Sequence, residues 1–122
     1  MNVLVVSSQP NFLSDGLHVL AQNDLVPHLQ NTVYDACAAS QTLAPSLVIL
    51  DADSASGDLA GTCQTLHDAS QAPIIVVSWE ALSETEAAAC FDAGAGARLL
   101  RSTSPTLLLS WAQAVTRRHQ SS

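Results

Sequence analysis

Residues 45–53 read Pro-Ser-Leu-Val-Ile-Leu-Asp-Ala-Asp, and this stretch decides the fold. The apolar residues 47–50 follow one another directly, whereas a strand with one wet face would alternate apolar and polar residues. A continuous apolar run closed by acidic residues is typical of a parallel strand that is buried on both faces. Because ligands and chemistry gather at the carboxyl ends of strands in open α/β sheets, Asp51 is the first candidate functional residue. Its position is equally compatible with a residue that starts a turn or caps the next helix.

Strands and helices alternate along the rest of the chain. Apolar runs predict strands at residues 3–6, 25–29, 47–50, 73–77 and 97–100. Apolar residues at helical spacing predict a helix after each strand, with buried faces formed by Leu13, Leu17 and Leu20, by Ala36, Ala39 and Leu43, by Leu59, Cys63 and Leu66, by Ala87, Ala88 and Phe91, and by Leu108, Trp111 and Val115. Pro10 suits the opening turn of the first helix, while Thr32 and Ser83 suit the caps of the second and fourth.

This order of elements predicts one parallel sheet with helices on both faces. Pro27 lies in the second strand, and proline cannot donate to a hydrogen-bond ladder, so that strand should be an edge. An edge position fits the strand order 2-1-3-4-5, in which ligands bind between the first and third strands. Ser7, Ser8 and Asp51 should therefore meet at this point.

The composition restricts the class of protein. The chain has 122 residues, which suits one domain, and its 4 basic and 11 acidic residues give a net charge of -7. An acidic domain repels phosphate backbones and anionic lipid headgroups, so we expect no direct binding of nucleic acid and no membrane association. No apolar run approaches a membrane span, and a strand pattern follows Asn2 where a signal peptide would lie. Three cysteines without a CxxC pair indicate core thiols in a reducing cytoplasm.

At several landmarks the sequence resembles the receiver domains of bacterial two-component response regulators, over nearly its whole length. The landmarks are the first strand with Pro10, the third strand with Asp51, the fourth strand with Ser78, and Ala93-Gly94-Ala95 before Leu99-Leu100. The resemblance implies an α/β fold, the flavodoxin-like (βα)5 three-layer sandwich, for residues 1–118. Residues 119–122 would then be a tail or the start of a linker to an effector domain.

The resemblance also implies roles at the carboxyl edge of the sheet. In receiver domains the aspartate at the place of Asp51 accepts a phosphoryl group from a histidine kinase. A serine or threonine at the place of Ser78 binds a phosphoryl oxygen, and a lysine at the place of Arg101 pairs with it. An acidic pair at the places of Ser7 and Ser8 holds a magnesium ion.

The sequence departs from that pattern at the acidic pair. Ser7 and Ser8 are neutral, whereas magnesium prefers several oxygen ligands that include carboxylates. Because two carboxylates are missing, we expect magnesium binding to be weak or absent, and we expect no other cofactor. Phosphoryl transfer depends on the metal to neutralise developing charge, so the loss of magnesium would also affect phosphorylation. Asp53 would compensate only if its carboxylate turned inward, at a place where the family uses the backbone alone.

Three further departures surround Asp51. Arg101 replaces the lysine, and its planar guanidinium does not fit a lysine site automatically. Arg98 replaces an aromatic residue that swings inward on activation in the family. Trp79 follows Ser78 where the family has a small residue, so its indole either covers and gates the pocket or turns outward as an anchor for a partner.

One set of residue types would suggest different chemistry. Ser78, His67 and Asp51 include the types of a hydrolase triad, which requires hydrogen-bond contact. His67 lies at the end of a helix that begins near the carboxyl edge of the sheet, where Asp51 is expected. His67 should therefore lie at the opposite edge. We therefore expect that the chain is not an enzyme.

These observations favour an atypical receiver domain that signals by protein–protein interaction or dimerisation, without conventional magnesium-dependent phosphorylation. Leu107 and Leu109, in the region of Trp111 on the last helix, exceed what one helix stripe buries and mark the expected contact face. A single exposed leucine is also common on ordinary surfaces. The partner would be a second copy or another protein, and the resemblance adds a histidine kinase and the setting of a transcriptional regulator.

Two alternatives stay open at this stage. In the first, Asp51 is a working phosphoacceptor with an unusual metal site. In the second, the space left beside Ser7 and Ser8 by the missing carboxylates senses a small molecule. A cavity at the two serines would favour the second alternative, and filling by Trp79 or Arg101 would disfavour it.

Overall fold

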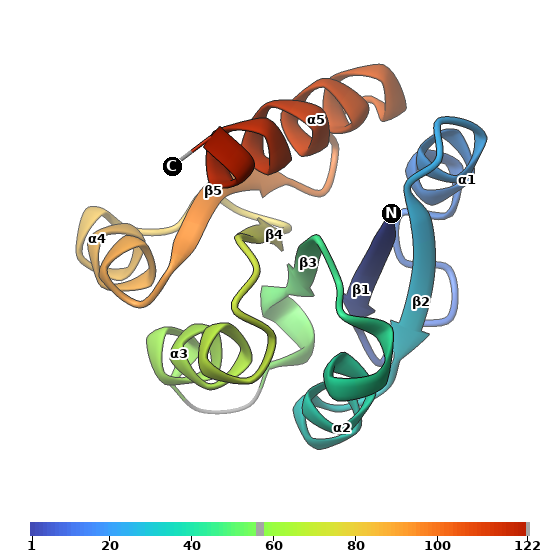
Figure 1. The fold of residues 1–122 in the computed structure, drawn as a ribbon. Coiled ribbons are helices and arrows are strands. Elements are labelled where there is room, and N and C mark those ends of the chain that lie inside the picture. Colours follow the sequence, from blue (N-terminus) through green and yellow to red (C-terminus); the bar gives the residue numbers. More distant parts are fainter. Residues whose placement is uncertain (56–57, 122) are drawn as a thin grey trace.

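The structure is a computed structural model that describes residues 1–55 and 58–121. Strands and helices alternate as the sequence predicts, with one short 3-10 helix after the third strand (Figure 1). The elements are β1 (Asn2–Val6), α1 (Ser14–Gln22), β2 (Val26–Gln30), α2 (Val33–Leu43), β3 (Leu47–Asp51), η1 (Ala52–Ser54), α3 (Leu59–Ser70), β4 (Ile74–Ser78), α4 (Glu84–Asp92), β5 (Ala95–Leu100) and α5 (Pro105–Ser121).

The five strands form one parallel sheet in the order β2-β1-β3-β4-β5, which confirms the predicted fold class and strand order. Figure 1 shows α1 and α5 on one face of the sheet and α2, α3 and α4 on the other. Every residue of β3 and β4 is buried, because helices cover both faces of these central strands. The carboxyl ends of β1, β3, β4 and β5 therefore meet at one edge, where Ser7, Asp51, Ser78 and Arg101 follow or end their strands.

Two apolar clusters, one on each face of the sheet, form the core. Val3, Val5, Ile49 and Ile75 point toward α1 and α5, and their neighbours in sequence point the other way. The edge strand β2 is less buried, as Pro27 predicted. The backbone nitrogen of Val26 donates to the carbonyl oxygen of Met1, on the side of β2 that faces the sheet. Because the backbone nitrogens of successive strand residues point to opposite sides, the ring nitrogen of Pro27 faces the open edge, where no donor is needed.

The predicted helix caps are confirmed at two helices, while the first helix starts later than expected. The hydroxyl of Thr32 accepts from the backbone nitrogen of Asp35, and that of Ser83 accepts from Glu86. At the first helix, Pro10 lies in a turn and α1 begins only at residue 14, after Leu13 takes a left-handed φ of 50°. The side chain of Leu13 still packs against the core, so the predicted apolar pattern extends one turn beyond the helix itself.

The buried face of α4 differs from the predicted one. Ala87 and Cys90 are buried, whereas Ala88 and Phe91 are exposed. The two buried side chains are small, and the phenyl ring of Phe91 is left on the surface. At the other end of the chain, α5 continues through Ser121, past the point where the sequence suggested a tail, and Ser122 lies outside the described residues. In the described part of the chain, no helix has the length and apolarity to cross a membrane.

Candidate functional site

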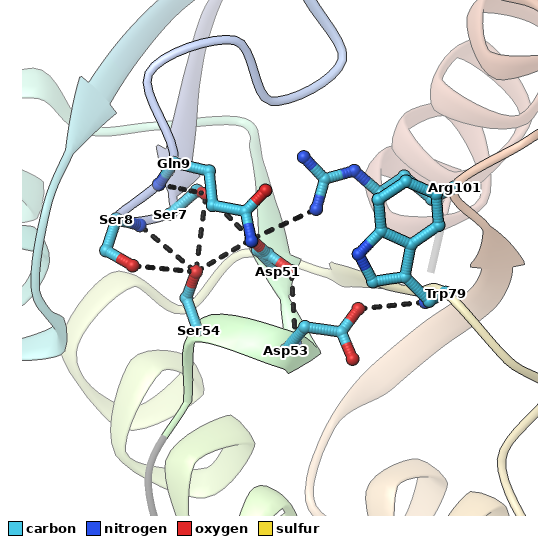
Figure 2. A network of polar contacts seen from close by, with 8 residues as sticks. All are labelled: Ser7, Ser8, Gln9, Asp51, Asp53, Ser54, Trp79 and Arg101. Atoms are coloured by element: carbon cyan, nitrogen blue, oxygen red, sulfur yellow. Dashed lines mark hydrogen bonds and ion pairs between the residues drawn. The ribbon is translucent and has the colours of Figure 1, made fainter.

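Asp51 ends β3 and is fully buried at the carboxyl edge of the sheet. One carboxylate oxygen, Oδ1, accepts a hydrogen bond of 3.1 Å from the backbone nitrogen of Asp53 and thereby caps η1. The residue is thus a helix cap and also the centre of a polar network (Figure 2). The interpretation of Asp51 as a cap is confirmed, and its functional role stays a prediction.

Two serine hydroxyls hold the other oxygen of Asp51. The Oγ atoms of Ser7 and Ser54 each donate to Oδ2 at 2.7 Å. Ser54 also accepts from the backbone nitrogen and the hydroxyl of Ser8, both at 3.1 Å. The predicted meeting of Ser7, Ser8 and Asp51 is therefore present, and Ser54 links all three. The sequence analysis missed Ser54, whose only signal is its position three residues after an aspartate that ends a strand.

Arg101 approaches Oδ2 of Asp51 from the opposite side. Its Nη1 lies 3.9 Å from that oxygen, and the side chain is 11 % exposed. The guanidinium is stacked between two aromatic rings, 5.0 Å from the ring centre of Phe12 and 4.5 Å from that of Trp79. Nη1 has no hydrogen-bond partner among the described residues. Arg101 thus offsets the charge of Asp51 without a hydrogen bond, and stacking on the two rings positions the guanidinium. Phe12 is a second residue that the sequence analysis missed.

Trp79 turns outward and also covers Arg101. Trp79 is 61 % exposed, while the guanidinium of Arg101 lies over one face of its indole. Figure 2 shows the two side chains next to each other. The backbone nitrogen of Trp79 donates to Oδ2 of Asp53 at 2.8 Å. Asp53 therefore points to the loop after β4 and does not turn inward to supply a second carboxylate beside Asp51.

Ser78 and Arg98 lie outside this network. The buried hydroxyl of Ser78 donates to the carbonyl oxygen of Glu80 at 2.6 Å, so it is directed into its own loop and not toward Asp51. Arg98 is exposed on β5 and lines, with Ser78, Leu82 and neighbouring residues, a cavity of about 300 Å³. The structure therefore brings together Ser7, Ser8, Asp51, Arg101 and Trp79 of the predicted site.

The residue types of a hydrolase triad are not assembled. His67 lies at the end of α3 with its Nδ1 3.3 Å from the carbonyl oxygen of Ala72, next to Gly94. This is the amino end of β4, opposite to Asp51, as predicted. Of the three predicted core thiols, Cys63 and Cys90 are buried, whereas Cys37 is only half-buried. Burial raises the pKa of Cys63 to about 12, so its thiol stays neutral.

Comparison with known proteins adds the fold. No protein-family model matches the chain, and no curated protein matches it. Among solved structures, a receiver domain from Methanospirillum hungatei JF-1 is 16% identical, with a TM-score of 0.85 over 98% of this chain and 96% of that chain. The beryllofluoride-activated NtrC4 receiver domain dimer is 20% identical, with a TM-score of 0.85 over 97% and 98%. The chemotaxis protein CheY4 of Vibrio cholerae is 20% identical, with a TM-score of 0.81 over 93% and 97%.

The chain has the fold of CheY-like receiver domains. At these identities the likeness extends to the arrangement of the elements and leaves the chemistry to the residues of the site. Asp51 lies at the end of the third strand of this receiver fold, where the sequence resemblance places the phosphoacceptor.

The residues of this receiver fold do not fit a bound magnesium ion. Magnesium requires several hard oxygen ligands, usually with more than one negative charge nearby. Among the residues that the structure describes, Asp51 is the one buried carboxylate. Ser7 and Ser54 are neutral, and Asp53 is bonded to the loop after β4. Within residues 1–55 and 58–121, no three His, Cys, Asp or Glu side chains come together as metal ligands. The positive charge beside Asp51 comes from Arg101.

Proposed function

We propose that this chain is an atypical receiver domain of a bacterial response regulator that signals through protein contacts, without magnesium-dependent phosphorylation. The observation that carries the proposal is that groups of the chain itself satisfy the hydrogen-bonding capacity and the charge of the Asp51 carboxylate. Both of its oxygens accept hydrogen bonds from within the chain, and Arg101 supplies a cation 3.9 Å away. A carboxylate in such an environment needs no metal to be stable when buried.

The arrangement of nearby groups supports the same proposal. A phosphoryl group on Asp51 would displace the hydroxyls of Ser7 and Ser54 from Oδ2. In the family that the sequence resembles, the serine or threonine at the place of Ser78 binds a phosphoryl oxygen. Here the hydroxyl of Ser78 donates to the carbonyl oxygen of Glu80 instead. Small-molecule sensing beside Ser7 and Ser8 is disfavoured, because Ser54 bridges the two serines and Arg101 lies on the other side of Asp51.

The contact surface in this proposal includes the exposed side of α5. Leu107 is 49 % exposed there, while Leu109 and Trp111 are partly buried and pack against the core. Leu100 at the end of β5 and Phe91 on α4 are exposed as well, and Figure 1 shows α4, β5 and α5 at the same end of the sheet. An interface between two copies or with another protein would cover these side chains.

An NMR titration of backbone amides with magnesium and then beryllofluoride, a mimic of the acyl phosphate, tests the proposal. We expect no shifts centred on Asp51, Ser78 and Arg101 at millimolar magnesium. The variant carrying Ser7→Asp and Ser8→Asp regains two carboxylates, and we expect it to bind magnesium in the millimolar range. Saturable shifts around Asp51 in the unmodified chain would mean that Asp51 is a working phosphoacceptor, and the proposal would be wrong.

A further inference from the structure

The free face of Trp79 is a fixed aromatic surface beside Asp51. One face of its indole is held by the guanidinium of Arg101, at 4.5 Å, and its backbone nitrogen is held by Asp53, at 2.8 Å. The side chain nevertheless remains 61 % exposed. A tryptophan that is positioned before binding loses little conformational entropy on contact, and such residues dominate many protein interfaces.

A groove of about 350 Å³ adjoins this surface, between the first turns of α1 and α5. Trp79 and Arg101 form one wall, and Leu13, Pro105 and Leu108 contribute apolar surface. The left-handed backbone of Leu13 delays the start of α1. The groove therefore offers space for an apolar side chain next to the indole.

The charges around the indole are negative. Asp53 is bonded to the backbone of Trp79, Glu80 follows it in sequence, and Asp15 lines the same groove, all three with exposed side chains. The one cation nearby among the described residues of the groove, Arg101, is offset by Asp51. The surface thus combines a π face with three carboxylates, and both attract a cation.

We propose that this surface binds a basic segment of a protein partner. An arginine or lysine of the segment stacks on the free face of Trp79 beside the carboxylate of Asp53, and a neighbouring apolar side chain enters the groove over Leu108. The inference rests on the proposed role as a protein-interaction module and adds the chemistry of the partner. The proposed binding surface at Trp79 is distinct from the surface formed by the exposed side chains of Phe91 on α4 and Leu107 on α5.

Short synthetic peptides test the inference on the 122-residue chain. The probes are three acetylated and amidated peptides in which leucine alternates with arginine, with serine or with glutamate. Backbone amide shifts report the site, and indole fluorescence in a Trp111→Phe background reports Trp79, since the chain has 2 tryptophans. We expect the arginine peptide to shift the amides of Leu13, Trp79 and Leu108, with an affinity that falls as salt is added. The serine and glutamate peptides should bind at least about tenfold more weakly.

Matched charge variants separate this surface from general attraction to an acidic protein. Asp15→Asn with Glu80→Gln removes two charges at the surface, and Asp68→Asn with Asp92→Asn removes two exposed charges on α3 and α4. The first pair should weaken binding of the arginine peptide about three- to tenfold and the second pair less than about twofold. Trp79→Ala, in a domain shown to be folded by its amide spectrum, should weaken binding about tenfold or more.

Three outcomes would overturn the inference. Equal binding of the serine peptide would make the groove a purely apolar site, and equal effects of the two charge pairs would mean unspecific attraction. Shifts centred on Phe91, with the amides of Leu13 and Trp79 unchanged, would place the contact on α4. The magnesium and beryllofluoride titration is read from a separate peptide-free sample. Failure of the proposed function therefore shows as shifts around Asp51, and failure of this inference shows in the peptide data alone.

Discussion

The two sides of the Asp51 carboxylate are built from different chemistry. On one side, the hydroxyls of Ser7 and Ser54 donate to it at 2.7 Å. On the other, the guanidinium of Arg101 stays 3.9 Å away and is held by the rings of Phe12 and Trp79. The short hydrogen bonds fix the position of the carboxylate, and the more distant cation offsets its charge. The serine side is thus rigid and local, whereas the arginine side connects Asp51 to the molecular surface at Trp79.

Removal of the shared carboxylate should have the largest effect, because both sides depend on it. Asp51→Ala leaves the hydroxyls of the buried Ser7 and the half-buried Ser54 without their acceptor, and it removes the negative charge beside the largely buried Arg101. We expect the free energy of unfolding to fall by about 3 kcal/mol, measured by urea denaturation with an unchanged slope. Asp53→Ala is the control, since that carboxylate is exposed, and it should cost less than about 1 kcal/mol. A more stable Asp51→Ala variant would show that the carboxylate is strained rather than satisfied.

Removal of one donor tests the serine side alone. Ser54→Ala deletes a hydrogen bond to a buried carboxylate and the acceptor for Ser8, and we expect a loss of about 2 kcal/mol in the free energy of unfolding. Ser8→Ala is the matched control in the same network, because Ser8 is exposed and bonds only at the rim; it should cost about 0.5 kcal/mol or less. Equal losses would mean that water replaces the Ser54 hydroxyl, and the serine side would then be no more rigid than the arginine side.

The strands and their order could be predicted from sequence, because a buried parallel strand requires a continuous apolar run. Residues 47–50 and 74–77 meet that requirement and are buried at every position. Pro27 marked the edge, since a missing donor is tolerated at an edge and not in the middle of a sheet. The placement of Asp51 at the carboxyl edge followed from these facts alone.

The contacts of Asp51 could not be predicted in the same way. Ser54 reaches Asp51 only because residues 52–54 form a 3-10 turn, and short turns leave no periodic signal. Phe12 and Trp79 meet across Arg101 although they follow different strands, so their contact depends on tertiary packing. The exposed Phe91 shows the same limit, because helical spacing identifies a face but not which of two adjacent apolar stripes is buried.

A double-mutant cycle on Trp79 and Arg101 tests the arginine side, where we expect the smallest effect. Arg101→Met keeps an apolar side chain between the rings and removes the charge, and Trp79→Leu removes the π face. Because the indole is 61 % exposed, its loss should cost little on its own, and the coupling free energy of the pair should be about 0.5–1 kcal/mol.

The corresponding cycle of Arg101→Met with Asp51→Asn provides the comparison. If the carboxylate and the indole both hold the guanidinium, each cycle gives a favourable coupling, and the Asp51 coupling is the larger because that pair is more buried. Zero coupling to Trp79 would mean that Asp51 and Phe12 position the arginine without the indole. A ligand on the free face of the indole would then have no route to the buried carboxylate, whereas a measurable coupling makes Arg101 the physical link between them.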